Sequence, residues 1–578
     1  MNFNLKSILI FALLIVIMPG LFGCGGSAAP EPANSSTSNT SPEAAADNEP
    51  AASTATGGTV RVGWPGSPDS LNPAMGVLEE AYIVYEMTYD TLYDLQFDGS
   101  FTLTLAESVD MSDDGKVYTY KMREGLKFHD GQPLTAKDVV FSYNLYKDHE
   151  DFPFLNSYTG YFDTIEAPDD STVVLTLTDP IPNLESQLIY LYVLPEHIWS
   201  AHSEGSAPTE FENTEMIGSG PFKMVEYKQN EFVHLAANLD YFDGRPKVDE
   251  VIFQTFANND ALVQAITTGQ VDMITEMPAT AVPTLRNAEN VTLVSGPPLA
   301  PDLRDIFFNQ IAPENCPPDD GVCSGHPALR DRQVRLALAH ATDKQKMIDV
   351  AMLGFGRPGR TLVPDGLGSW YNSSLEDYAF DLAKANQILD EAGYQDTDGD
   401  GVREMPDGGQ PLEFRLYWPS DTPEAPRLAD LLNETWPQVG VKLQPQAFDP
   451  DALTSVCCPA FDFDVIIWGW SSGPDPSDLM VVMTTAEIPT GSSETGYSNP
   501  EYDRLFAEQA VELDKDKRRE LNWELQRIAF EDVVYIVPYY KEKVQAFRSD
   551  RFEGWLTDAA KLELADPTSL SVITQVNE

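Results

Sequence analysis

Strand-like and helix-like segments alternate along the second half of the chain, and this alternation limits the fold more than any other feature. One such unit has a strand at Val248–Phe256, a helix at Asp260–Thr268 that ends at Gly269, and a strand at Val271–Ile274. Strands that alternate with helices form α/β lobes with partly parallel sheets, which hold ligands at strand ends and between lobes. The pattern also predicts strands at 59–63, 172–177, 412–418, 441–446, 463–468 and 533–539, helices at 79–93, 331–353, 427–436 and 501–530, a hairpin within 113–126, and a helix capped by Thr135.

The length of the chain predicts more than one lobe. A single hydrophobic core stops growing at about 250–300 residues, and this chain has 578. Its hydrophobic fraction of 42% and charged fraction of 22% are typical of a globular protein and exclude a disordered one.

The charge balance restricts the partners. The chain has 91 acidic and 37 basic residues, so its formal net charge is −54. Nucleic acids and anionic lipids are bound by basic surfaces, so no nucleic-acid role is expected. An acidic surface favours solubility, and a cleft that binds cations is the alternative.

The first 23 residues predict a signal peptide. Lys6 supplies a positive charge, and the apolar run Ile8–Met18 is too short to anchor the chain across a bilayer. Leu21 to Cys24 resembles the bacterial lipobox, in which the cysteine sulfur is diacylated and becomes the new N-terminus. Because two acyl chains anchor stably, Cys24 is the expected lipid attachment site. An ordinary signal peptide with an incidental cysteine is the alternative.

Residues 24–58 predict a lipidated flexible linker. From Gly25 to Gly58 the chain has no aromatic residue and no Leu, Ile or Val. Such a segment cannot bury enough apolar surface to offset the entropy of ordering it. We therefore expect a protein of the cell envelope, held at the outer face of the cytoplasmic membrane or in the periplasm.

The other four cysteines form an even set, which favours disulfides outside the cell. We favour a Cys316–Cys323 bridge that closes a local loop. A Cys457–Cys458 bridge, or two cross-links between the pairs, are alternatives. A zinc site is less favoured because CxxC spacing is absent.

Several blocks of sequence resemble the extracellular solute-binding proteins of family 5, which include peptide- and nickel-type substrate-binding lipoproteins of ABC importers. Their order along residues 59 to 575 also matches. The blocks are Leu105–Ser108, Asp113–Gly115, Leu126–Gly131, Leu134–Val139, Ile217–Phe222, Ala265–Asp272 and Val334–Ala339.

The resemblance implies a periplasmic-binding-protein-like α/β fold of type II, with two lobes built from three domains around a ligand cleft. Domain I would comprise residues 59–100, 215–305 and 541–578, with domain II at 101–214 and domain III at 306–540. Crossovers near Asp305–Asn309 and Pro538–Lys541 would form a hinge that closes around the ligand.

The resemblance also places candidate ligand-binding residues after the strand Phe463–Trp468. In peptide receptors of this family, a loop there supplies an aromatic residue and, three positions later, an aspartate that pairs with the peptide's amino terminus. Trp470 resembles the aromatic residue, but Gly473 stands at the aspartate position and Asp475 follows two residues later. Either Asp475 substitutes or the ligand is not a simple peptide. The predicted ligand-binding residues are Trp470, Ser471, Trp468, Asp475, Trp64, Phe308 and Asn309.

The segment from Asp396 to Glu404 resembles the start of an EF-hand loop. Asp396, Asp398 and Asp400 stand at positions 1, 3 and 5, and Gly401 stands at position 6. Position 12 would be Asp407. We expect a structural calcium ion here or, as the alternative, a surface turn closed by its own hydrogen bonds. No cofactor is required otherwise.

The expected function is that of a non-enzymatic, monomeric receptor of an ABC importer. It would bind peptides or related solutes and pass them to the transmembrane permease subunits. An oligosaccharide or metal-chelate receptor of the same family is one alternative. A lipid-anchored extracellular hydrolase is another, because the five residues Gly469 to Gly473 fit GxSxG, although Pro474 opposes the helix that a hydrolase needs there.

Overall fold

The computed structural model describes residues 57–277, 279–557 and 561–576. The expected signal peptide and nearly all of the expected linker, including Cys24, lie outside the described residues. None of the helices in the described part combines the length and hydrophobicity that a membrane crossing requires.

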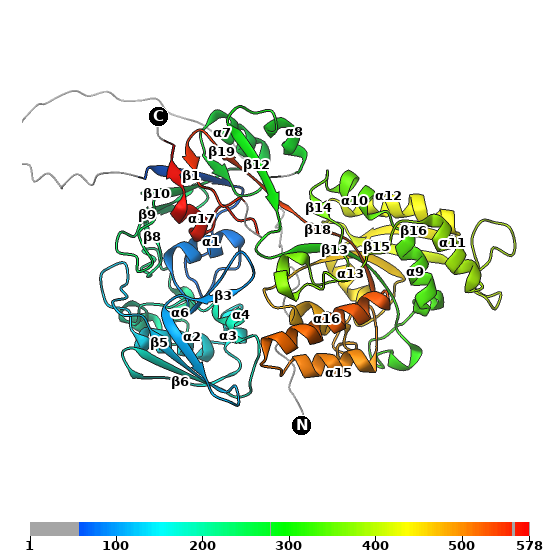
Figure 1. Cartoon of the computed structure of the whole chain (residues 1–578), viewed down its shortest axis with the longest axis horizontal. Coiled ribbons are helices and arrows are strands. Elements are labelled where there is room, and N and C mark those ends of the chain that lie inside the picture. Colours follow the sequence, from blue (N-terminus) through cyan, green and yellow to red (C-terminus); the bar gives the residue numbers. More distant parts are fainter. Residues whose placement is uncertain (1–56, 278, 558–560, 577–578) are drawn as a thin grey trace, which may run out of the picture. The chain divides into compact units, whose positions relative to one another are not determined.

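The first large sheet has seven strands in the order β12-β19-β11-β1-β10-β9-β8. Its central strand β1 is parallel to β10 and β11, whereas the outer pairs are antiparallel. One face packs on α7 and α8, which contact β19 and β12 (Figure 1). The elements are β1 (Thr59–Trp64), β8 (Phe222–Lys228), β9 (Phe232–Ala237), β10 (Glu250–Thr255), β11 (Met273–Ile274), β12 (Val291–Gly296), β19 (Lys543–Arg548), α1 (Glu79–Thr88), α7 (Asn259–Thr268), α8 (Val282–Leu285) and α17 (Pro567–Val572).

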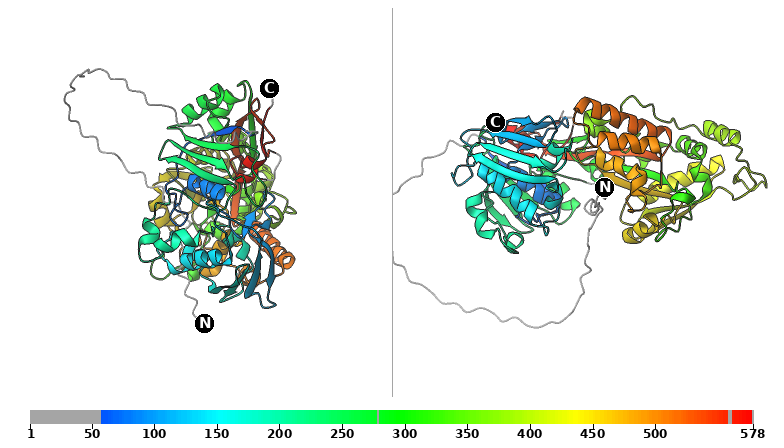
Figure 2. Two further views of the ribbon diagram at one scale, coloured as in Figure 1. Left: turned by 90° about the vertical axis from the view of Figure 1, so that its left-hand side faces the viewer. Right: turned by 90° about the horizontal axis from the view of Figure 1, so that it is seen from below.

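A second, antiparallel sheet has four strands in the order β4-β5-β7-β6 (Figure 2). The helix α2 packs on β6 and β7 and begins with the predicted cap, since Thr135 and Asp138 form a complete capping box. The elements are β4 (Ala106–Met111), β5 (Val117–Met122), β6 (Phe162–Asp169), β7 (Thr172–Leu177), α2 (Ala136–Asp148), α3 (Leu155–Tyr158), α4 (Leu184–Leu188), α5 (Glu196–Trp199) and α6 (Ala207–Glu210).

The third sheet has six strands in the order β14-β18-β13-β17-β15-β16 and is covered by helices on both faces. Helices α9 to α12 cover one face, and α13 to α16 cover the other, where α15 and α16 lie side by side (Figure 1). The elements are β13 (Asp302–Phe308), β14 (Gly356–Arg357), β15 (Glu413–Pro419), β16 (Lys442–Phe448), β17 (Val465–Ser471), β18 (Tyr535–Lys541), α9 (Arg332–His340), α10 (Lys344–Ala351), α11 (Leu382–Glu391), α12 (Ala425–Thr435), α13 (Pro450–Cys457), α14 (Ser477–Met480), α15 (Pro500–Gln509) and α16 (Lys515–Glu531). Two short pairs complete the strands: β2 (Tyr93–Leu95) with β3 (Phe101–Leu103), and β20 (Phe552–Glu553) with β21 (Thr574–Gln575).

Two neighbouring connections join the seven-stranded sheet to the six-stranded sheet. Residues 297–301 link β12 to β13, and Glu542 alone links β18 to β19. The linked strands pair with each other on both sides, β12 with β19 and β13 with β18. The expected crossover near Asp305–Asn309 lies several residues past the first connection, because it begins inside β13, whereas the one near Pro538–Lys541 ends directly before Glu542. The division into three domains stays a prediction.

Candidate functional site

The strand β17 ends in the aromatic segment that the sequence singles out. Trp468 and Trp470 are half-buried and pack on the same hydrophobic cluster, and Ser471 is exposed. The Trp470 indole donates a hydrogen bond of 3.1 Å to Oε2 of Glu494. Alternation along the strand puts both tryptophans on one face, as expected. Their ligand-binding role stays a prediction.

Behind Trp470 lie two buried carboxyl groups that the sequence did not predict as part of the site. Glu494 accepts a second hydrogen bond, of 3.3 Å, from the Tyr535 hydroxyl. Asp305 on β13 lies opposite Trp468 and is fully buried, and neither of its carboxyl oxygens has a hydrogen-bond partner among the described residues. Burial raises the pKa of both carboxyl groups, and the charge of Asp305 raises the pKa of Glu494 further. An acid directly before the apolar run Ile306–Phe308 was the signal that could have found Asp305.

Asp475, the predicted substitute for the missing ligand-pairing aspartate, is paired with an arginine. Its carboxylate accepts hydrogen bonds of 2.7 and 2.8 Å from the Arg518 guanidinium, and both side chains are buried. Arg518 also lies over the ring of Trp370, 5.0 Å from its centroid. A bidentate pair of this kind uses both carboxylate oxygens, and a ligand-binding role for Asp475 stays a prediction.

Three other candidates lie in the interior. Trp64 is buried, stacks on Phe253 with centroids 4.6 Å apart, and donates a hydrogen bond to Thr255. Phe308 is fully buried. The Asn309 side-chain amide donates hydrogen bonds to the backbone carbonyls of Phe461 and Phe463, which precede β17. All three are buried, and their ligand-binding role stays a prediction.

Asp478 on α14 is the acid that lies beside Gly473. A Cβ atom added to Gly473 would lie 3.0 Å from Oδ2 of Asp478. The Asp478 side chain is exposed, and no described residue hydrogen-bonds to its carboxylate. Desolvation and, second, the charge of Asp475 raise the pKa of Asp478 to about 6, although the charge of Arg518 opposes the shift. Sequence spacing alone could not choose between Asp475 and Asp478.

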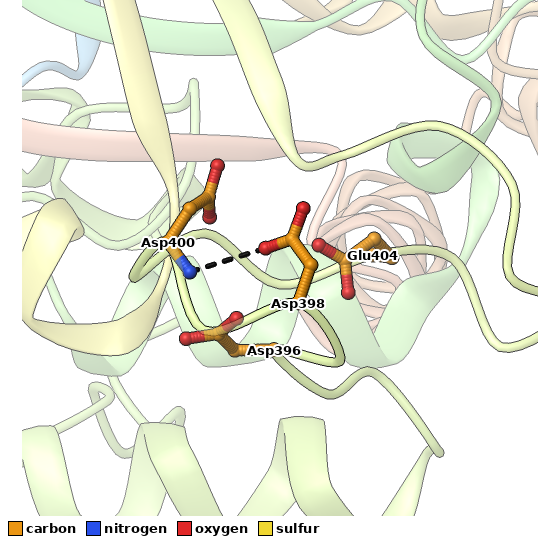
Figure 3. Close-up of side chains that lie close together, drawn as sticks. All are labelled: Asp396, Asp398, Asp400 and Glu404. Carbon is orange, nitrogen blue, oxygen red and sulfur yellow. Dashed lines mark hydrogen bonds between the residues drawn. The ribbon is translucent and has the colours of Figure 1, made fainter.

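The acidic loop of the third-sheet domain brings four carboxylates together (Figure 3). One ligand atom from each of Asp396, Asp398, Asp400 and Glu404 lies within 4.8 Å of the others. Backbone amides of the loop donate to the three aspartates, and Thr397 donates twice to Glu404 at 2.8 Å. The fourth carboxylate is that of Glu404, and not that of Asp407, which the EF-hand spacing indicated. Isolated β-bridges pair Glu404 with Gln395 and with Pro411 and so fold the loop back on itself. Hard carboxylate oxygens in this number suit Ca²⁺.

The four cysteines in the described residues form two disulfides. One disulfide joins Cys316 to Cys323, as favoured from the sequence, and the other joins the adjacent Cys457 and Cys458. The alternative of cross-links between the pairs is therefore not what the structure contains.

Comparison with known proteins identifies the family. The model of the bacterial extracellular solute-binding proteins, family 5, matches residues 100–489. The oligopeptide-binding protein AppA of Bacillus subtilis is 28% identical over 568 residues, which cover 95% of this chain and 96% of the relative. Heme-binding protein A of Haemophilus influenzae is 27% identical over 75% of this chain and 77% of the relative.

Solved structures show the same fold. The ABC transporter substrate-binding protein CtaP of Listeria monocytogenes superposes with a TM-score of 0.73 at 27% identity, covering 90% of this chain and all of that one. Bacillus subtilis AppA in complex with a nonapeptide gives a TM-score of 0.64 at 26% identity, with the same coverage. The α/β architecture is thus that of a type II periplasmic binding protein. With a family model matching most of its length, the chain belongs to the bacterial extracellular solute-binding proteins of family 5.

Proposed function

We propose that this protein captures peptides outside the cytoplasmic membrane and delivers them unchanged to the permease of an ABC importer. The observation that carries the proposal is the pair of adjacent connections, residues 297–301 and Glu542, between the two large sheets. Two short connections side by side let two rigid bodies rotate about them, which is how a hinge closes on a ligand. The likeness to a peptide receptor over almost the whole length supports peptides as the solute class.

The receptor acts as a monomer and contacts the membrane through its lipid anchor. Diacylation of Cys24 and the flexible linker that follows would keep the binding domain near the permease subunits. The strongly negative net charge agrees with a partner other than nucleic acid.

The arrangement around Ser471 favours a receptor over a hydrolase. A serine nucleophile needs a base within hydrogen-bond reach. The histidine contacts of the described chain lead elsewhere: five rings pair with backbone carbonyls or acids, one contacts Glu250, and one stacks on Phe211.

Native mass spectrometry of the protein purified from its own organism tests the proposal. We expect co-purified peptides of unchanged mass and, after their removal and re-addition, a higher melting temperature. Ligand at about 100 times Kd adds about 2.7 kcal/mol to the free energy of unfolding. Trp470→Ala should abolish most of the shift, whereas the matched variant Trp523→Ala on α16 should keep it. Cleavage of the peptides during incubation would contradict the proposal.

We also propose that Asp396, Asp398, Asp400 and Glu404 bind a structural calcium ion. Four carboxylate groups within one small loop repel one another unless a cation is present. The ion would hold the loop between α11 and β15 and would take no part in solute binding.

A further inference from the structure

Four tyrosines and two acids from three separate parts of the chain gather in one place. Tyr82 and Glu86 stand on α1, Asp478 stands on α14, and the remaining tyrosines come from the domain of the four-stranded sheet. These last are Tyr158 at the end of α3 and Tyr190 and Tyr192 after α4. We call these six residues the tyrosine–acid cluster.

Neither of the two acids has a charge partner among the described residues. Glu86 and Asp478 are exposed, and neither carboxylate has a hydrogen bond or ion pair with a described residue. Nearby protein atoms nevertheless exclude water from part of Glu86. This desolvation raises the pKa of Glu86 well above its usual range, and the charges of Asp566 and Asp94 add to the rise. Arg518 offsets little at Asp478, because its guanidinium is paired with Asp475.

Tyr190 connects the two acids. Burial raises its pKa, and the charges of both Glu86 and Asp478 raise it further, so both carboxylates lie within electrostatic range of this ring. Its ring stacks on that of Tyr158, with centroids 5.1 Å apart and planes inclined by 17°. Tyr158 and Tyr190 are half-buried and leave part of this aromatic surface accessible.

A second observation indicates a ligand. Tyr192 is 2% exposed, and its hydroxyl has no hydrogen-bond partner among the described residues. Burial is the main cause that raises the pKa of Tyr192, and the charges of Glu86 and then Tyr82 are the next largest causes. The ring therefore belongs to the same cluster. A buried hydroxyl without a partner costs free energy that a bound polar group would recover.

The chemistry of the tyrosine–acid cluster selects a cation. Tyrosine faces attract ammonium and guanidinium groups, and unpaired carboxylates in a desolvated place attract them more strongly. An acidic solute would find no opposite charge there. We propose that Glu86, Asp478, Tyr158 and Tyr190 bind a positively charged amine or guanidinium group of the transported solute other than a peptide's α-amino group, and that the receptor therefore selects cationic solutes. This inference rests on the proposed role of the chain as a solute receptor.

Calorimetric titration of the ligand-free protein with four probes tests the inference: Ala-Lys-Ala, Ala-Ala-Ala, Ala-Glu-Ala and spermidine. At pH 7.5 we expect Ala-Lys-Ala to bind at least tenfold more tightly than Ala-Ala-Ala, and Ala-Glu-Ala to bind least. Glu86→Gln and Asp478→Asn should each remove about tenfold of the affinity for Ala-Lys-Ala and less than threefold for Ala-Ala-Ala. The matched control Glu107→Gln, an exposed acid on β4, should change neither.

The outcomes separate the two proposals. Equal binding of the three peptides overturns the cation site and leaves the receptor function standing. Binding of spermidine without any peptide supports the cation site and overturns peptide capture. If neither spermidine nor Ala-Lys-Ala binds, the cation site is overturned, and the co-purified solute then decides the receptor function separately.

Discussion

At the scale of single residues, Asp305 and Glu494 form an unusual pair behind Trp470. Both carboxyl groups are buried, and each disfavours ionisation of the other. Glu494 has two hydrogen-bond donors, Trp470 and Tyr535, whereas the Asp305 carboxyl has no partner among the described residues. The pair therefore retains protons at a pH where ordinary carboxyl groups have lost them.

We predict that Asp305→Asn stabilises the protein at high pH. The pKa of Asp305 is raised above 3.8, so the folded state binds more protons than the unfolded state once the pH exceeds that value. The free energy of unfolding then falls as the pH rises, and the neutral amide removes this loss. The variant should match the parent at about pH 4 and exceed it by about 2 kcal/mol at about pH 8 in urea denaturation.

The exposed acid Glu107 supplies the control for this measurement. For Glu107→Gln, the free energy of unfolding should change between the two pH values by the same amount as it does for the parent. If Asp305→Asn changes the free energy of unfolding by the same amount at every pH, packing around the side chain, and not ionisation of Asp305, causes the change.

Residue types and spacing located β17 but could not assign a role to each side chain. Trp470 lies where the pattern indicated, whereas Trp64 and Phe308 are buried. An aromatic residue at a strand end has the same local sequence whether a loop covers it or not. Asp475 was chosen by its proximity to Gly473 along the chain, but a distant residue, Arg518, pairs with it in the interior.

At the scale of elements, local sequence signals predicted where helices begin and end better than they predicted breaks within a long helical segment. The Thr135 cap and the left-handed Gly269 end are where the sequence placed them. The predicted helices at 331–353 and 501–530 are each two helices in the structure. Asp343 and Asp514 cap the second helix of each pair, and hydrophobic periodicity that continues through both helices hid these breaks.

The acidic loop carries the prediction that belongs to this scale. We expect Ca²⁺ to bind with a Kd of about 10⁻⁴–10⁻³ M, as in extracellular modules, and to raise the melting temperature. Asp398→Asn and Asp400→Asn should weaken binding at least tenfold, because each removes charge from the four-acid cluster. Calorimetry in metal-free buffer measures both effects.

The exposed acid Asp421, outside this loop, provides the matched variant. Asp421→Asn should bind Ca²⁺ like the parent. If all three variants bind it equally, the ion is held elsewhere, and the loop is a turn closed by its own hydrogen bonds.

At the scale of the whole molecule, the order of elements was predictable and the position of the hinge was not. Repeated βα units and the family blocks indicated the α/β lobes from the sequence alone. The first crossover was misplaced because β13 looks like any buried strand, and only its partners reveal the sheet to which it belongs. Closure also depends on contacts between segments far apart in sequence, which no local pattern reports.

One such contact joins the domain of the four-stranded sheet to α16. Lys515 Nζ lies 2.7 Å from Oε2 of Glu185 on α4, and nearby Leu513 packs against Gly115, where a Cβ atom would clash with it. If the two lobes separate about the connections at 297–301 and Glu542, this ion pair breaks. The pair therefore favours the closed state, although an exposed pair contributes only about 0.2–1 kcal/mol.

Charge exchange across this contact tests closure without altering the solute site. Glu185→Lys or Lys515→Glu alone should weaken solute binding by about two- to fivefold and shift the scattering profile toward a more open form, because ligand binds the closed state better. The double variant Glu185→Lys/Lys515→Glu restores opposite charges and should regain most of the affinity. A double variant as weak as the single variants would mean that these side chains do not meet in the bound state, and another contact would then have to hold the lobes together.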